Sequence, residues 1–185
     1  MSQGSYCLWF KPSGTAYDIL ARAIRELATQ LAGPVFEPHV TLIGSLEGTE
    51  EELVQQTEQF ARQLEPFTMV LTEASYRDEH FQCIFMLVEQ TAPIMNAYAL
   101  ARDFFQKPNQ VFVPHLSLAY GSYPDSRKRL IIDTLPPDVR ASFDASALYL
   151  IRSDTPDPKD WHQIAAVRTS CGELSGDNRP WSPSK

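Results

Sequence analysis

The chain has 185 residues, of which 43% are hydrophobic and 21% are charged, a composition typical of a globular protein and not of a disordered one. Its formal net charge of −7 disfavours binding to long nucleic acid, and no apolar run is long enough to span a membrane. A small anionic substrate is compatible with this charge.

The first half of the chain is predicted to contain four strands and two helices. Apolar residues that recur every three or four positions predict an amphipathic helix over 18–31, which Gly33-Pro34 ends. A second such helix is predicted over 50–64. The strands are predicted over 6–10, 36–44, 67–75 and 81–89.

The second half repeats this order, with helices over 92–105 and 126–135 and strands over 113–120, 145–152 and 161–169. The repeat predicts a duplicated α+β unit whose two interleaved lobes pack about a pseudo-twofold axis. We therefore expect one domain over residues 1–174 and a flexible polar tail over 175–185.

Three widely spaced cysteines, Cys7, Cys83 and Cys171, form no Cys-x-x-Cys pair. This spacing indicates free thiols, with Cys7 and Cys83 in apolar strands. The amino terminus lacks the basic and apolar stretches of a secretory signal, so we expect a cytoplasmic protein. No long unprotected strand edge requires a partner, so we expect a monomer.

One short motif occurs once in each half, as Pro38-His39-Val40-Thr41-Leu42 and as Pro114-His115-Leu116-Ser117-Leu118. Random order predicts only about 0.3 Pro-His pairs in a chain of this composition. Because side chains alternate along a strand, each histidine shares a face with the hydroxyl two residues later. Each strand therefore presents an imidazole and a hydroxyl together.

Two imidazoles and two hydroxyls around one groove suit displacement at phosphorus. One neutral imidazole can take a proton from water while the opposite imidazolium protonates the leaving oxygen, each contributing typically 10² to 10⁴ in rate. The hydroxyls of Thr41 and Ser117 would hold the non-bridging oxygens. Histidine suits both roles because its ordinary pKa is near 6.5, and this chemistry needs neither a metal ion nor another cofactor.

Three alternatives use the same residues differently. Each histidine could be a hydrogen-bonded strand residue that has no catalytic role. A zinc site would need more ligands than His39 and His115 supply, and Glu37 is the nearest carboxylate. Nucleophilic attack by Thr41 or Ser117 lacks the Gly-x-Ser-x-Gly turn that exposes such a serine.

The double motif resembles the signature of the 2H phosphoesterase superfamily, which has two copies of His-x-Thr/Ser. Further segments resemble the plant- and yeast-type cyclic nucleotide phosphodiesterase family within it; these are residues 8–12, 36–42, 81–85 and 115–120 and the last strand from Trp161. The resemblance spans about residues 6–170.

This resemblance implies a bilobal fold with two antiparallel sheets that line a central, water-filled cleft and with helices packed outside. It implies metal-free hydrolysis of ADP-ribose 1'',2''-cyclic phosphate and nucleoside 2',3'-cyclic phosphates, by-products of tRNA splicing, to the 1''- or 2'-phosphomonoester. By the same resemblance His39 and His115 are catalytic, His115 as base and His39 as acid, and Thr41 and Ser117 bind phosphate.

Two aromatic residues, Tyr120 and Phe81, match substrate-binding positions of that family. Trp9 and Trp161 also match aromatic positions of the family, and we expect them to belong to the core or the cleft wall and not to contact the substrate. His80 and His162 lie outside the motif and are expected at the surface or rim. The segment between Phe105 and Pro114 lacks the cysteine pair of some plant members, so redox control of this loop is not indicated.

Two further functions remain open from the sequence. The substrate could be an RNA end bearing a 2',3'-cyclic phosphate, although the net charge disfavours long RNA. The chain could also be a nucleotide-binding module without turnover. The four motif positions are all occupied by histidines and hydroxyl residues, which favours an enzyme.

Overall fold

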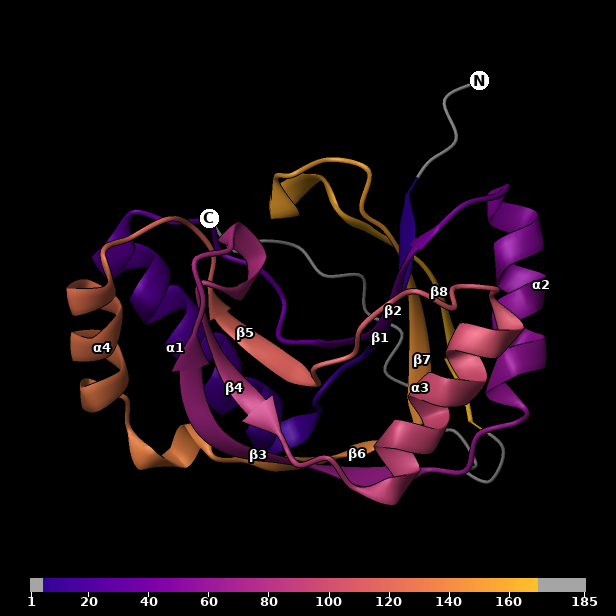
Figure 1. The fold of residues 1–185 in the computed structure, drawn as a ribbon, viewed down its shortest axis with the longest axis horizontal. Helices are drawn as coiled ribbons and strands as arrows, with labels where there is room; N and C mark the ends of the chain where they lie inside the picture. Colours follow the sequence, from indigo (N-terminus) through magenta and orange to yellow (C-terminus); the bar gives the residue numbers. More distant parts are fainter. Residues whose placement is uncertain (1–4, 170–185) are drawn as a thin grey trace.

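The computed structural model describes residues 5–169 and contains a long curled sheet with helices around it (Figure 1). The helices are α1 (Gly14–Leu31), α2 (Glu50–Ala61), α3 (Ala92–Phe104) and α4 (Asp125–Thr134). The strands are β1 (Tyr6–Phe10), β2 (Val40–Leu46), β3 (Phe67–Tyr76), β4 (Ile84–Val88), β5 (His115–Ala119), β6 (Ser142–Ala145), β7 (Ala147–Arg152) and β8 (His162–Arg168). Short 3₁₀ helices are η1 (His80–Gln82), η2 (Pro137–Val139) and η3 (Pro158–Asp160).

The eight strands form one sheet in the order β6-β3-β4-β5-β2-β1-β7-β8, with every neighbouring pair antiparallel. The mixed helix and strand content agrees with the prediction, but the two separate sheets that the family resemblance implies are joined here. The join is narrow, because the register between β2 and β5 contains the single pair Val40 with Leu116 within the described residues. The division into two lobes about a pseudo-twofold axis stays a prediction.

Strands from the two halves of the chain are interleaved in the sheet. The hairpin of β3 and β4, from the first half, lies between β6 and β5 from the second half. β7, from the end of the chain, pairs with β1 and carries β8 at its other edge. This exchange brings β2 and β5, where the two histidine motifs lie, to the centre of the sheet.

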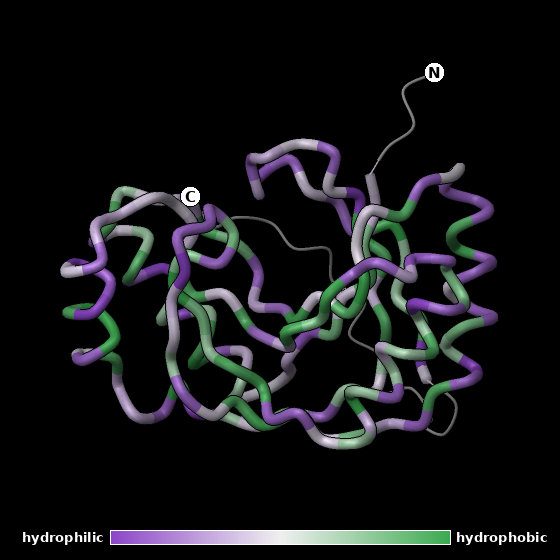
Figure 2. Tube along the Cα trace, in the orientation of Figure 1, coloured by the Kyte–Doolittle hydropathy of each residue, from purple (hydrophilic) through white to green (hydrophobic). Residues whose placement is uncertain are grey.

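The helices cover the sheet on its outer side. α1 packs near β5, α3 near β2, and α2 near β7 and β8, and Figure 1 shows α1 and α4 beside one half of the sheet and α2 and α3 beside the other. Hydrophilic and hydrophobic residues alternate along α2 and α4 (Figure 2), as expected of amphipathic helices at a surface. None of the helices within residues 5–169 is long and apolar enough to cross a membrane.

The two faces of β1 have different roles. Tyr6, Leu8 and Phe10 belong to the main hydrophobic core, whereas Cys7 and Trp9 form a smaller cluster on the opposite face with Ile151. This alternation follows from the period of two in a strand. It places Trp9 on the inner face of the curled sheet.

Several predicted boundaries differ from the observed ones. α1 begins at Gly14, four residues earlier than predicted. The strand predicted over 81–89 begins only at Ile84, because a turn that Gln82 N closes on Glu79 O forms η1 instead. The sequence did not indicate β6, whose four residues are too few for a periodic pattern.

Both described cysteines are buried free thiols, as predicted. Cys7 lies in β1, but Cys83 lies between η1 and β4 and not inside a strand, which corrects its expected position. Cys171 and the expected tail over 175–185 lie outside the described residues.

Candidate active site

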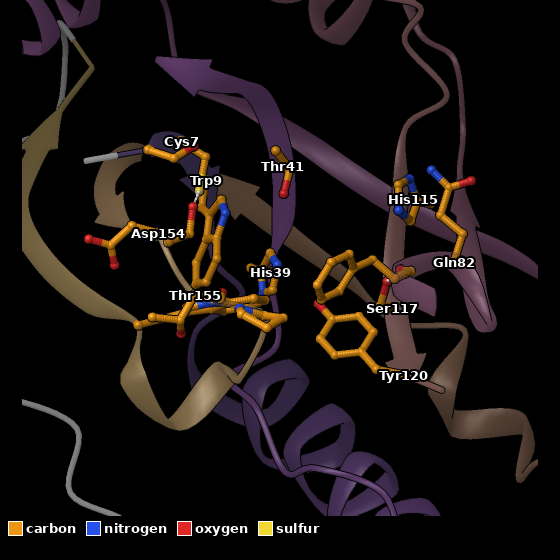
Figure 3. A pocket seen from close by; sticks show the side chains of 15 residues that line it. Cys7, Trp9, His39, Thr41, Gln82, His115, Ser117, Tyr120, Asp154 and Thr155 are labelled. Carbon is orange, nitrogen blue, oxygen red and sulfur yellow. Dashed lines mark hydrogen bonds between the residues drawn. The ribbon is translucent and has the colours of Figure 1, made fainter. Parts of the chain in front are cut away.

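A cavity of about 530 Å³ opens on the inner face of the sheet, where β2 and β5 join (Figure 3). All six residues predicted for the site line it, and so do Trp9 and Trp161. Among residues 5–169, the lining consists of Ser5, Cys7, Trp9, His39, Thr41, Phe81, Gln82, His115, Ser117, Tyr120, Ser153, Asp154, Thr155, Pro156 and Trp161.

His39 lies immediately before β2 and is held on two sides. Its Nδ1 is 2.6 Å from the carbonyl oxygen of Glu37, and its ring stacks on Trp9 with the centroids 3.5 Å apart and the planes 9° from parallel. A carbonyl oxygen only accepts, so Nδ1 carries the hydrogen. Nε2 is therefore the nitrogen left to exchange a proton with a ligand.

His115, at the start of β5, repeats this arrangement. Its Nδ1 is 2.7 Å from the carbonyl oxygen of Val113, again two residues earlier, and its ring meets the edge of Phe85 at 5.2 Å. Both histidines therefore carry their hydrogen on Nδ1. Figure 3 shows His39 near the centre of the view and His115 to its right, on the neighbouring strand.

Both imidazoles favour the neutral form. Burial lowers the pKa of His39 from 6.5 to about 3, more than offsetting the hydrogen bond to the Glu37 carbonyl. Burial also lowers the pKa of His115, which is only half-buried. The free protein therefore presents two neutral imidazoles near pH 7.

Each hydroxyl residue lies beside the histidine of the neighbouring strand. Continuing the antiparallel register by one residue on each side of the Val40–Leu116 pair sets His39 opposite Ser117 and Thr41 opposite His115. Ser117 Oγ donates to the carbonyl oxygen of Phe81 over 2.9 Å, which ties β5 to η1. The two histidines thus occupy one diagonal of a four-residue arrangement and the hydroxyls the other.

Aromatic rings form much of the remaining wall. Trp161 meets Trp9 edge to face at 5.6 Å, and its Nε1 donates to the carbonyl oxygen of Thr155 over 2.8 Å. Tyr120 is buried and stacks on Phe36 at 3.8 Å; burial raises the pKa of Tyr120, so its phenol stays protonated. The expectation that the two tryptophans are core or wall residues therefore holds.

Phe81 differs from an ordinary strand phenylalanine. It lies in η1, is 43% exposed, and its ring is 5.2 Å from Tyr120 and 6.0 Å from Trp161. An exposed ring beside two others offers a face to a planar ligand. His80 and His162 are exposed, as predicted.

The sequence did not indicate several wall residues. Cys7 and Gln82 line the cavity, as do residues 153–156 of the loop between β7 and β8. Figure 3 shows Asp154 and Thr155 on the same side as Trp9. The prolines and aspartates of this loop mark a turn, but no sequence pattern fixes where a loop folds back.

The Glu37 carboxylate does not face the cavity, because it binds Lys11, with Oε2 2.6 Å from Nζ. No group of three or more His, Cys, Asp or Glu side chains within residues 5–169 is arranged to hold a metal ion. Among the described residues, the cavity is lined by five ionisable side chains, those of His39, His115, Asp154, Cys7 and Tyr120.

The chain is similar to known proteins in sequence and in fold. The model of the 2'-5' RNA ligase superfamily matches residues 12–157. The chain is 27% identical over 167 residues to a cyclic phosphodiesterase of Arabidopsis thaliana, covering 86% of this chain and 92% of that protein.

Solved structures share the fold at low sequence identity. LigT of E. coli in its apo form has a TM-score of 0.66 at 14% identity and covers 91% of this chain and 99% of its own. LigT complexed with 3'-AMP has a TM-score of 0.65 at 14% identity, with coverages of 92% and 100%. The protein TT0787 of Thermus thermophilus has a TM-score of 0.61 at 17% identity, with coverages of 89% and 97%.

Proposed function

The chain belongs to the 2'-5' RNA ligase superfamily, and on that premise we propose that it is a metal-independent cyclic phosphodiesterase. Its substrates are ADP-ribose 1'',2''-cyclic phosphate, nucleoside 2',3'-cyclic phosphates or both, which it opens to the 1''- or 2'-phosphomonoester. One observation carries the proposal: two histidines, each with Nδ1 bound to a backbone carbonyl, share a cavity with Thr41 and Ser117. The cyclic phosphodiesterase activity named for the Arabidopsis relative supports it.

The reaction is an in-line displacement. One imidazole removes a proton from water as the water oxygen bonds to phosphorus, and the bond from phosphorus to one ribose oxygen breaks. The opposite imidazolium gives its proton to that oxygen, which leaves as a hydroxyl, so the site regains its proton balance with the histidine roles exchanged. Thr41 and Ser117 hold the non-bridging oxygens, and Ser117 turns its hydroxyl from the Phe81 carbonyl to do so.

Protonation of one histidine is coupled to substrate binding. Both rings are neutral in the free protein because burial disfavours their charged forms. A phosphodiester anion beside an imidazole favours the imidazolium and raises its pKa. The family resemblance gives His39 the role of acid. His39 can therefore act as the acid only when the negative charge of the bound phosphate favours its protonated form.

The cavity favours a small nucleotide over a long RNA. Its volume lies in the usual range for small-molecule sites. Of the described residues that line it, none is Lys or Arg, and the one acidic residue, Asp154, forms an ion pair with Arg152. Affinity for polynucleotides depends on cationic phosphate contacts. The complex of LigT with 3'-AMP supports a nucleotide-sized ligand.

Phosphorus NMR of the EDTA-treated protein tests the proposal. We expect ADP-ribose 1'',2''-cyclic phosphate or 2',3'-cyclic AMP to be converted to a phosphomonoester without added metal. Turnover confined to an oligonucleotide 2',3'-cyclic end would replace this substrate class by RNA ends. Tight nucleotide binding with no turnover of any of the three would instead establish a binding module.

Truncation of Phe81 tests the aromatic wall. The exposed ring of Phe81, beside Trp161 and Tyr120, is available to stack on a base, and such stacking contributes about 1–3 kcal/mol. We expect Phe81→Ala to raise KM about tenfold and to change kcat less than about threefold. Leu130→Ala, an exposed apolar position on α4 outside the cavity lining, is the matched control. Unchanged KM in Phe81→Ala would remove this residue from the binding site.

A further inference from the structure

A buried cation, Lys11, lies near the cavity wall, with its Nζ 6.0 Å from the centroid of the Trp9 ring. Lys11 follows β1, and its side chain is only 7% exposed. Its Nζ is 2.6 Å from Glu37 Oε2 and 2.8 Å from Gln163 Oε1, and it lies over the Tyr149 ring at 4.5 Å. A buried charge is costly unless it is paired and hydrogen-bonded, and the proposed chemistry makes no direct use of this amine.

The partner of Lys11 is the residue that orients His39. The Glu37 carboxylate binds Lys11, and the Glu37 carbonyl oxygen accepts from His39 Nδ1 over 2.6 Å. Pro38 follows Glu37 and restricts its backbone to extended conformations. Two features therefore restrict the Glu37 carbonyl that accepts from His39: Pro38 follows it in the chain, and the Glu37 side chain is bound to Lys11.

The second motif shows that this anchor is an addition to the strand geometry. His115 Nδ1 binds the carbonyl oxygen of Val113, and Pro114 follows. A valine side chain cannot form an ion pair, so the Val113 carbonyl has no charged side-chain anchor of this kind. The Lys11–Glu37 pair therefore serves something beyond the shared Pro-His arrangement, and it lies at the more deeply buried histidine.

We propose that Lys11 and Glu37 are positioning residues for His39: their ion pair fixes the Glu37 carbonyl and so keeps His39 in the Nδ1–H tautomer, stacked on Trp9. Its catalytic consequence rests on the proposed function, in which His39 exchanges a proton through Nε2. When the carbonyl is free to turn, His39 populates both tautomers, and Nε2 is then partly blocked by its own hydrogen.

Three variants separate positioning from folding. Glu37→Ala removes the anchor but leaves Lys11 its bonds to Gln163 and its place over Tyr149. Lys11→Met with Glu37→Met removes both charges together, because removing one partner of a buried pair strands the other. Glu37→Gln keeps an oxygen that can accept from Lys11 and serves as the conservative rescue.

The measurements are long-range ¹H–¹⁵N NMR of the histidine rings in the free protein, kcat and KM for the substrate that wild type turns over, and unfolding in urea. In Glu37→Ala and in the double variant we expect a mixture of His39 tautomers, with kcat lowered about tenfold and KM changed less than about twofold. Glu37→Gln should retain the Nδ1–H tautomer and most of kcat. The His115 signals should stay unchanged throughout.

Lys128→Met is the matched control, because Lys128 is also a buried lysine, 1% exposed and paired with Asp125 on α4. It should lower stability without altering the His39 tautomer. A folded Glu37→Ala protein with the wild-type His39 spectrum and kcat would overturn the positioning role while leaving the proposed function intact. Absence of turnover in wild type would overturn the function, and the NMR result would still decide the positioning.

Discussion

Replacing either His39 or His115 by alanine is expected to lower kcat at least about 10²-fold, because each removes one of the two proton transfers. Both side chains line the cavity, and each donates a hydrogen bond from Nδ1 to one backbone carbonyl. KM should change much less than kcat, since the hydroxyls and the aromatic wall are untouched. Rates are measured with the cyclic phosphate that wild type hydrolyses, at a temperature where urea unfolding shows each variant to be folded.

The double variant distinguishes a two-histidine reaction from two independent contributions. If the imidazoles act as a unit, His39→Ala combined with His115→Ala should lose little more than the worse single variant. His162→Ala is the control, because His162 is exposed on β8 and outside the cavity lining. A wild-type kcat in either single variant would contradict the two-histidine mechanism.

The parts of the site that strand periodicity controls were predictable. The spacing of two between His39 and Thr41, and between His115 and Ser117, predicts a shared face, and all four residues line one cavity. These features depend on the backbone period alone, which short sequence segments contain.

The remaining parts depend on contacts between distant segments. The Lys11–Glu37 pair joins the end of β1 to the approach to β2, and Gln163 on β8 completes it. Asp154 reaches the cavity through a loop with no periodic pattern. The first residues of the strand predicted over 81–89 lie in η1 or between η1 and β4, and the Gln82 N–H donates to the Glu79 carbonyl oxygen there. A single sequence contains no measure of such long-range pairing.

Acid is expected to destabilise the protein through His39. Burial lowers its pKa from 6.5 to about 3 in the folded state, whereas the unfolded chain regains the ordinary value. Between pH 6.5 and about 3 the unfolded state therefore binds up to one more proton than the folded state. The free energy of unfolding should fall as the pH falls through this window, by about 1.4 kcal/mol per pH unit, and His39 should add no pH dependence above about pH 7.5.

Urea unfolding of wild type and His39→Gln at about pH 7, 6, 5 and 4 isolates this contribution. Carboxylates whose pKa is lowered, such as those of Glu52 and Asp157, also lose stabilising interactions in acid, but they are common to both proteins and cancel in the difference. The stability of wild type relative to His39→Gln should therefore decline steadily below pH 6.5. A difference that stays constant across this series would mean that the folded protein protonates His39 as readily as the unfolded chain does. The neutral imidazole that the proposed chemistry starts from would then not be maintained by burial.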